Sequence, residues 1–278
     1  FFPAIRMQAM IEAGLDKINI SVNGMSDEQF LEFTGRKVNF NNYVQTYKNY
    51  PAVLVWAIGN EENHFYGKDN GIVNNARHSA YFSLVNEMAH IAYNIEGASY
   101  HPIMAVSLEF PNQMNTVGNA AGGADDASIP YVDMWGINHY PGSTFGNFFN
   151  TYQTKTSKPL IVTEYGIDVL NYSSLTEYES VQADWDVNLW REINSSIAVG
   201  GSLMEYSDEW WKGVNVKLPE GICPDTNMSY QSRCGYPTTS HPDGFGNEEW
   251  WGIMRIVKNG TGIDIMQSRQ AYYALKNE

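Results

Sequence analysis

Two apolar, β-branched segments of the sequence each lead into a carboxylate. The segment Val53–Ile58 is followed by Gly-Asn-Glu, which places Glu61 just past its end. The segment Leu160–Thr163 is followed directly by Glu164. Cleavage of a glycosidic bond with retained configuration requires two carboxyl groups, one to protonate the leaving oxygen and one to attack the sugar carbon. The two glutamates are therefore candidates for that pair.

Each motif also has an ordinary interpretation. Asn60 and Glu61 fit the start of a polar loop, and Glu164 fits a solvated carboxylate or a structural salt bridge at a strand end. In the catalytic interpretation, Glu61 protonates the leaving group and later deprotonates water, and the Asn60 amide hydrogen-bonds a neighbouring sugar hydroxyl. The occurrence of two such strand ends in one chain favours the catalytic interpretation.

A third apolar segment, Val132–Ile137, is followed by Asn-His-Tyr. A hydroxyl at Tyr140 is suited to donate to the nucleophilic carboxylate and hold it ionised. His139 fits either a structural or a substrate-contacting role. The six histidines show no metal-ligand spacing, so we predict neither a metal site nor another cofactor.

Four tryptophans form two adjacent pairs. Aromatic faces stack on the apolar faces of sugar rings, through the same amphipathic character that favours Tyr and Trp at interfaces. Half of each pair fits equally well in a protein core, so we expect one member of each pair to reach a substrate cleft. The four residues are Trp210, Trp211, Trp250 and Trp251.

Strand-like and helix-like segments alternate along the chain. Apolar residues at steps of three and four predict a helix over Asn74–Ile95. Ser174 and Glu177 form a capping-box signature for a helix that ends near Ser196, and Asp264 is expected to cap a last helix that ends near Lys276. Further helices are expected over Phe1–Gly14 and from Ser26 to Gly35. The predicted strands are Lys17–Val22, Val53–Ile58, Ile103–Leu108, Val132–Ile137, Leu160–Thr163 and Gly201–Tyr206.

This alternation predicts an α/β fold with a parallel sheet covered by helices. A closed barrel and an open sheet both fit the pattern. Polar side chains at the ends of several different strands favour a TIM-type (β/α) barrel, whose sites are built from strand ends. The first strand is not followed by a Gly-rich phosphate loop, which disfavours the open sheet. We interpret residues 1–278 as a single barrel domain.

The three strand-end motifs resemble strands four, six and seven of the clan-A (β/α)8-barrel glycoside hydrolases. Leu54–Glu61 and Pro159–Gly166 are similar to the family 2 β-glycosidases. Gly200–Glu209 is similar to the eighth strand of the family 72 β-1,3-glucanosyltransferases. The resemblance extends from about Ile18 to the C-terminal end. It implies a retaining hydrolase or transglycosylase that acts on a β-linked glycan, with β-1,3-glucan as the expected substrate.

The resemblance also implies a role for individual residues. Glu61 is matched to the acid/base and Glu164 to the nucleophile. Asn60 is matched to the contact with the sugar 2-hydroxyl, and Tyr140 to the partner of the nucleophile. The segment Glu205–Trp211 is matched to the eighth-strand wall. The expected substrate-binding residues are Asn60, His139, Tyr140, Glu205, Trp210, Trp211 and Trp250.

The resemblance further implies an incomplete barrel. The clan places its Asn-Glu motif on strand four, yet only one convincing strand, Lys17–Val22, precedes Val53. We therefore expect the first two barrel strands to be missing from residues 1–278, and a second polypeptide or fragment is one possible source of them. The arginine that the family usually supplies from its second strand has no match, since Arg6 falls in a helix-like segment.

The composition limits the classes of partner. The formal net charge is −14, which disfavours binding to nucleic acid or to an anionic membrane. No apolar run approaches the roughly 20 residues of a membrane span. Hydrophobic residues make up 43% and aromatic residues 14% of the chain, which is typical of a globular protein rather than a disordered one. A neutral oligo- or polysaccharide is the partner that fits best.

The cysteines and asparagines favour a secreted, extracellular or cell-wall protein. Cys223 and Cys234 lie close together in a loop-like segment, where an oxidising compartment would allow a disulfide. In a reducing compartment they would be two free thiols. Asn-x-Ser/Thr triplets, the acceptor pattern for N-linked sugar, occur at Asn171, Asn194, Asn227 and Asn259.

Two functions remain open from the sequence. The pair of glutamates favours a glycoside hydrolase or glucanosyltransferase. The incomplete N-terminal half favours a secreted structural or carbohydrate-binding protein, built on a glycosidase-like barrel without catalysis.

Overall fold

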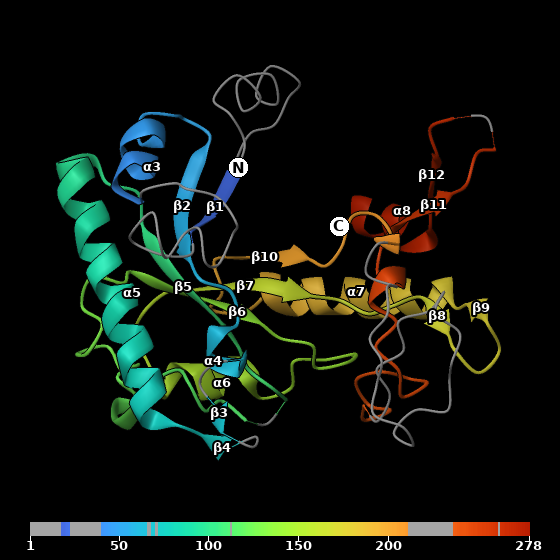
Figure 1. The fold of residues 1–278 in the computed structure, drawn as a ribbon. Helices are drawn as coiled ribbons and strands as arrows, with labels where there is room; N and C mark the ends of the chain where they lie inside the picture. The colour runs from blue at the N-terminus through green and yellow to red at the C-terminus, as the bar shows by residue number, and fades with distance from the viewer. Residues whose placement is uncertain are drawn as a thin grey trace. The chain divides into compact units, whose positions relative to one another are not determined.

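The computed structural model describes residues 18–22, 40–65, 68–69, 72–111, 113–210, 236–260 and 262–278 (Figure 1). Two compact units make up the structure. The first comprises residues 1–109, 113–138 and 150–161, and the second comprises residues 110–112, 139–149 and 162–278. The interpretation of residues 1–278 as one domain stays a prediction, and each unit is described by itself.

The first unit is built on a parallel sheet. Strands β1 (Ile18–Val22), β2 (Val53–Ile58), β5 (Ile103–Leu108) and β6 (Met134–Asn138) pair in that order, each parallel to the next. The bounds of β2 and β5 are those predicted from the sequence. Long apolar strands of this kind form where both faces of a sheet are covered, so their apolar runs are nearly continuous. All five residues of β6 and five of the six residues of β2 are buried.

Two layers of side chains cover this sheet. On one face, Val55, Ala57, Met104, Val106 and Met134 form a buried cluster. On the other, Trp135 meets Phe82 of helix α5 (Asn75–Glu96), with ring centroids 5.5 Å apart. The predicted helix over Asn74–Ile95 is confirmed within one residue at each end. The Asn74 side chain caps its first turn by accepting from the Arg77 backbone N–H at 3.1 Å.

The second unit contains strand β10 (Gly200–Leu203) and most of strand β7 (Leu160–Tyr165). The first two residues of β7 belong to the first unit. Its main helices are α7 (Glu179–Asn194) and α8 (Gln270–Lys276). Ala183 of α7 and Ala271 of α8 share a buried cluster with Ile253 and Met254. The antiparallel hairpin of β11 (Met254–Val257) and β12 (Ile265–Ser268) precedes α8.

The largest sheet among the described residues has six strands in the order β1-β2-β5-β6-β7-β10. These are the six strands that the sequence predicts, although the predicted ends differ for β6, β7 and β10, and the predicted start of the first strand, Lys17, lies outside the described residues. Two backbone hydrogen bonds show that β6 and β7 run in the same direction. Trp135 donates to Pro159, and four residues later His139 donates to Glu164, both at 2.9 Å. The predicted parallel sheet is therefore confirmed.

The remaining described elements are short. They are helices α3 (Phe40–Tyr47), α4 (Glu62–Phe65) and α6 (Phe148–Gln153), the 3-10 turns Gly97–Ser99, Ala120–Gly122 and Glu248–Trp250, and the strand pairs β3 (Lys68–Asp69) with β4 (Ile72–Val73) and β8 (Leu170–Asn171) with β9 (Thr176–Glu177). None of the described helices is both long and apolar enough to cross a membrane.

Two predicted helix starts are wrong. The Ser174 hydroxyl donates to Asn171 Oδ1 at 2.9 Å in the turn between β8 and β9, and α7 begins only at Glu179. Asp264 does not cap the last helix, because its Oδ1 accepts from the Asn259 N–H at 3.1 Å in the hairpin before α8. In both places the side chain forms a hydrogen bond within a local turn instead of capping a helix, which is the usual competition for Ser and Asp side chains.

Several predictions fall outside the described residues. These are the helices over Phe1–Gly14 and from Ser26 to Gly35, and the positions of Trp211, Cys223, Cys234 and Asn227.

Candidate active site

The end of β2 turns sharply, through Gly59 and then Glu61. Gly59 has φ +71° and Glu61 has φ +63°, a left-handed conformation that is uncommon for any residue other than glycine. A Cβ at position 59 would lie 2.1 Å from the Tyr81 hydroxyl oxygen, so no other residue fits there without displacing Tyr81. This turn leaves Asn60 exposed and Glu61 half-buried just beyond the strand.

Asn138, the last residue of β6, holds both polar side chains of this turn. Its side-chain amide donates to Glu61 Oε1 at 2.8 Å and to Asn60 Oδ1 at 3.1 Å. Asn138 itself is fully buried. The sequence singled out the Asn-His-Tyr segment but gave no role to Asn138. The sequence feature that could have identified Asn138 is its position at a strand end, two residues before Tyr140.

Glu62, the neighbour of Glu61, has a different environment. Its Oε2 accepts from the Asn60 backbone N–H and from the Tyr81 hydroxyl, the latter at 3.4 Å. Burial raises the pKa of Glu62, and these hydrogen bonds partly oppose that effect. The Glu62 carboxyl therefore closes the turn from within, and Glu61 is the carboxylate of this pair that contacts the β6 strand end.

Glu109, just past the end of β5, is a further strand-end carboxylate with a structural role. It is 2% exposed, and its oxygens accept from the backbone N–H groups of Asn115, Thr116 and Val117 at 2.9–3.0 Å. Burial raises the pKa of Glu109, and the three N–H donors oppose that effect. Both carboxylate oxygens of Glu109 accept from the backbone of this loop, so a carboxylate at a strand end is not by itself a catalytic group.

In the second unit, Glu164 lies on β7 and is half-buried. The Tyr140 hydroxyl donates a short hydrogen bond to Glu164 Oε2 and also contacts the Met204 sulfur at 2.8 Å. The expected hydrogen bond between Tyr140 and Glu164 is present, and the roles of the two residues in catalysis stay predictions. A hydrogen bond of this kind to a carboxylate favours its ionised form.

His139 is packed in the interior of the second unit. It is 2% exposed, and its ring stacks on Phe148 with centroids 4.3 Å apart and lies 5.8 Å from the ring of Phe145. Of the two roles that the sequence left open, this environment favours the structural one.

The aromatic residues near Tyr140 differ in exposure. Trp251 is 4% exposed and meets Tyr140 edge-on, with centroids 4.9 Å apart. Trp210 is 38% exposed, and its ring meets that of half-buried Trp250 at 4.5 Å. Glu205 is half-buried, and its backbone N–H donates to Trp251 O at 3.3 Å. One member of the Trp250–Trp251 pair is therefore core, as expected, and contact with substrate stays a prediction for the others.

Three of the four candidate glycosylation asparagines are described. Asn194 is exposed at the end of α7, whereas Asn171 and Asn259 are half-buried. The Asn259 side-chain nitrogen, the atom to which sugar would attach, donates to Ile263 O at 3.3 Å.

Comparison with known protein families decides the classification. The model of glycosyl hydrolases family 2, TIM barrel domain, matches residues 7–195, which is more than half of the chain. The chain belongs to glycosyl hydrolase family 2. Membership of this family confirms the clan-A resemblance and the barrel fold class inferred from the strand-end motifs. No curated protein matches the sequence.

Solved structures agree with this family 2 chain in fold. A β-glucosidase from Thermotoga maritima in complex with castanospermine aligns with TM-score 0.55 and 13% identity, over 98% of this chain and 76% of that one. The family 1 β-glucosidase of the same organism in complex with isofagomine lactam aligns with TM-score 0.53 and 13% identity, again over 98% and 76%. At this identity the likeness shows the fold alone.

The family 2 chain is short beside other structures that it matches. It aligns with a Bacteroides uniformis β-glucuronidase with TM-score 0.45 and 15% identity, over 73% of this chain and 28% of that one. It thus spans less than a third of the length of that enzyme.

Proposed function

We propose that this family 2 domain is a retaining glycoside hydrolase or transglycosylase that acts on a β-linked glycan. The observation that carries the proposal is the end of strand β6, which supplies a donor to each candidate carboxylate. Asn138 donates to Glu61, and Tyr140, two residues later, donates to Glu164. A polar contact of this kind to both members of the pair is what a double-displacement site requires, because each carboxylate must be held in a defined orientation.

In the first step of the proposed reaction, the Glu164 carboxylate attacks the anomeric carbon. The bond from that carbon to the leaving oxygen breaks, and Glu61 transfers its proton to that oxygen. The product is a glycosyl ester on Glu164 and an ionised Glu61. The hydrogen bond from Tyr140 supports this step by keeping Glu164 ionised before the attack.

In the second step, Glu61 removes a proton from an acceptor hydroxyl, which attacks the same carbon and releases Glu164. If the acceptor is water, the outcome is hydrolysis. If it is a sugar hydroxyl, the outcome is transfer to a longer glycan. Both reactions share the glycosyl ester, so both are included in the proposal.

We propose β-glucan as the substrate, with β-1,3 linkage. The support is the likeness of Gly200–Glu209 to the eighth strand of the family 72 glucanosyltransferases. The exposed ring of Trp210 lies in this region and offers an apolar face to a sugar. The acidic net charge of −14 is compatible with a neutral glucan.

Product analysis on a panel of β-glucans, β-galactosides and β-mannans tests the proposal. We expect turnover of at least one β-glucan, and a loss of about a thousandfold or more in Glu164→Gln, as for removal of a catalytic nucleophile. Glu87→Gln, an exposed position on α5, is the matched control and should retain full activity. Turnover that Glu164→Gln leaves intact would disprove the role of Glu164.

The alternative is a carbohydrate-binding or structural protein without catalysis. It is favoured by the six strands of the largest described sheet, where a TIM barrel has eight. Binding of a β-glucan with no turnover, by a chain supplemented with any fragment that completes the barrel, would support it. Under either function we propose a secreted or cell-wall location, on the grounds of the four glycosylation triplets and the two neighbouring cysteines.

A further inference from the structure

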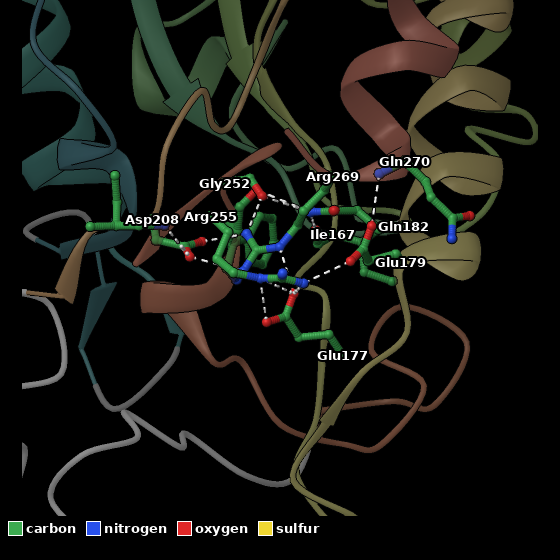
Figure 2. Close-up of polar contacts among 11 residues, drawn as sticks. Ile167, Glu177, Glu179, Gln182, Asp208, Gly252, Arg255, Arg269 and Gln270 are labelled. Atoms are coloured by element: carbon green, nitrogen blue, oxygen red, sulfur yellow. Dashed lines mark hydrogen bonds and ion pairs between the residues drawn. The ribbon is translucent and has the colours of Figure 1, made fainter. Parts of the chain in front are cut away.

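Arg269, just before α8, is fully buried and forms hydrogen bonds with all three of its guanidinium nitrogens (Figure 2). Its Nη1 and Nη2 donate to the two carboxylate oxygens of Asp208 at 2.6 and 2.9 Å, a two-point pairing in which the Asp208 side chain is also fully buried. Its Nε donates to Glu177 Oε2 at 2.8 Å. This planar, two-point geometry is available to arginine and not to lysine.

The same guanidinium also holds a backbone carbonyl. Nη1 of Arg269 donates to Gly252 O, and the Gln182 side-chain amide donates to the same oxygen at 3.3 Å (Figure 2). The Gln182 amide also donates to Trp251 O at 3.2 Å. A Cβ at Gly252 would lie 2.2 Å from the Asp208 backbone nitrogen. The backbone of Trp251 and Gly252 is therefore fixed by buried side chains from two helical regions and by close packing against Asp208.

Trp251 transmits this position to the candidate nucleophile. Its indole N–H donates to Gly246 O at 2.6 Å, so both its backbone and its ring are held. Its ring meets Tyr140 edge-on at 4.9 Å, and the Tyr140 hydroxyl donates to Glu164. Each contact in this series lies within the second unit.

We propose that Arg269 is a positioning residue for the reaction, which through Gly252 and Trp251 sets the Tyr140 hydroxyl against Glu164. The inference rests on the proposed function, and it assigns a catalytic consequence to a side chain remote from the reacting atoms. A purely structural Arg–Asp pair would affect the stability of the fold and leave the nucleophile unchanged. The two roles differ in their effect on the nucleophile of the folded enzyme.

The neighbouring Arg255 provides a matched control. It pairs with the same Glu177 carboxylate at 2.7 Å and with Glu179 at 2.7 Å, and it is one-third exposed. The contacts found for Arg255 are with these two carboxylates, whereas Arg269 contacts Gly252 as well (Figure 2). Arg255→Lys therefore perturbs the same ionic network without changing the support of Trp251.

The test compares Arg269→Lys with Arg255→Lys by steady-state kinetics across pH, on a substrate that the wild type turns over. We expect Arg269→Lys to lower kcat by about tenfold to a hundredfold, because a small misplacement of a catalytic hydrogen bond has an effect of that size. We expect little change in KM. The acidic limb of the pH profile should move to higher pH, since weaker donation by Tyr140 disfavours the ionised form of Glu164. Arg255→Lys should leave the limb unchanged.

A double-mutant cycle shows whether Arg269 acts through Tyr140. In a Tyr140→Phe background, Arg269→Lys should have no further effect on the acidic limb. A shift of equal size in both backgrounds would overturn the inference, and so would an unmoved limb in Arg269→Lys alone. The pH at which activity falls is a property of the folded, active molecules. A variant that is only less stable would therefore show lower activity at every pH, with no shift of the acidic limb.

A spectroscopic measurement separates this inference from the proposed function. Fluorine NMR of protein labelled with 5-fluorotryptophan, with the Trp251 signal assigned by Trp251→Phe, needs no turnover. Arg269→Lys should shift the Trp251 signal and Arg255→Lys should not, and an unmoved Trp251 signal overturns the inference. If the wild type turns over no glycoside, the proposed function fails, whereas normal turnover with an unmoved acidic limb in Arg269→Lys refutes the positioning role alone.

Discussion

The side-chain amide of Asn138 donates to both Glu61 and Asn60, with its two hydrogens divided between the two oxygens. Removal of this amide should therefore affect the proposed acid/base directly. A hydrogen bond to a carboxylate favours its ionised form, so Asn138→Ala should make Glu61 harder to ionise. We expect the alkaline limb of kcat/KM to move to higher pH, with a fall in kcat/KM of about tenfold or more. A pH–rate profile checks this, and a limb that moves to lower pH would contradict it.

The stereochemical outcome tests the pair as a whole. We predict that Glu61 and Glu164 act as the acid/base and the nucleophile of a retaining glycosidase. The first-formed sugar should then keep the β configuration, which NMR of the early products detects. A first product of α configuration would indicate an inverting site and contradict the role of Glu164 as nucleophile.

The buried carboxyl of Asp186 on α7 predicts a pH dependence of stability. Burial raises its pKa well above the ordinary value, and the Ile167 backbone N–H only partly opposes this effect. The folded state therefore favours the neutral acid. That contribution is complete below the unfolded pKa of about 4 and is lost as pH rises toward the folded pKa. Asp186→Asn, which cannot ionise, should gain stability relative to the wild type between pH 4 and pH 7.

Thermal unfolding of both proteins across this pH range measures the difference. Asp184→Asn, at an exposed position on the same helix, is the control for the loss of one negative charge from α7. A difference for Asp186→Asn that stays constant from pH 4 to pH 7 would show that Asp186 does not titrate as expected.

The tight turn at Gly59 predicts a large effect of a single methyl group. Gly59 and Gly146 both have positive φ, +71° and +54°, but nothing lies within 4 Å of a Cβ at Gly146. Gly146→Ala should therefore lower the free energy of unfolding by only the conformational term, about 1 kcal/mol. Gly59→Ala adds a clash with Tyr81 and Glu62, and it should lower the free energy of unfolding by roughly 1–3 kcal/mol more. Urea unfolding measures both, and equal losses would mean that the turn has room to adjust.

The secretion argument is tested by mass spectrometry of the native protein. We predict that Cys223 and Cys234 are bonded to each other and that at least one of the four candidate asparagines carries sugar. Asn194 is the favoured position among those described, because it is exposed at a helix end. Two free thiols together with unmodified asparagines would instead place the protein in a reducing compartment.

The sequence predicts the strands well and the helix starts poorly, for a physical reason. A buried parallel strand is a continuous apolar run, and such a run identifies itself without reference to its neighbours, as for Val53–Ile58 and Ile103–Leu108. A helix start depends on which acceptor the first free N–H groups find. Ser174 and Asp264 were equally suited to a turn, and each forms its hydrogen bond with a residue three to five positions away within that turn.

The same limit applies to the site. Strand-end carboxylates can be read from the sequence, but Glu61, Glu62 and Glu109 look alike there and differ only in what surrounds them. Asn138 was overlooked because an amide at a strand end has many uses, and its two acceptors come from a segment 77 and 78 positions away. Arg269 could not be found at all from the sequence, since its role depends on a carbonyl brought to it by the fold.

The left-handed backbone of Glu61 has a consequence for engineering and for evolution. Glycine or asparagine would adopt φ +63° at lower cost, so Glu61 occupies a position where another residue would make a more stable protein. A library selected only for thermal resistance should therefore enrich Gly or Asn at position 61 and lose the proposed acid/base. A second selection that also requires sugar cleavage should retain glutamate at position 61. The difference between the two selections measures how much the carboxylate contributes to fitness.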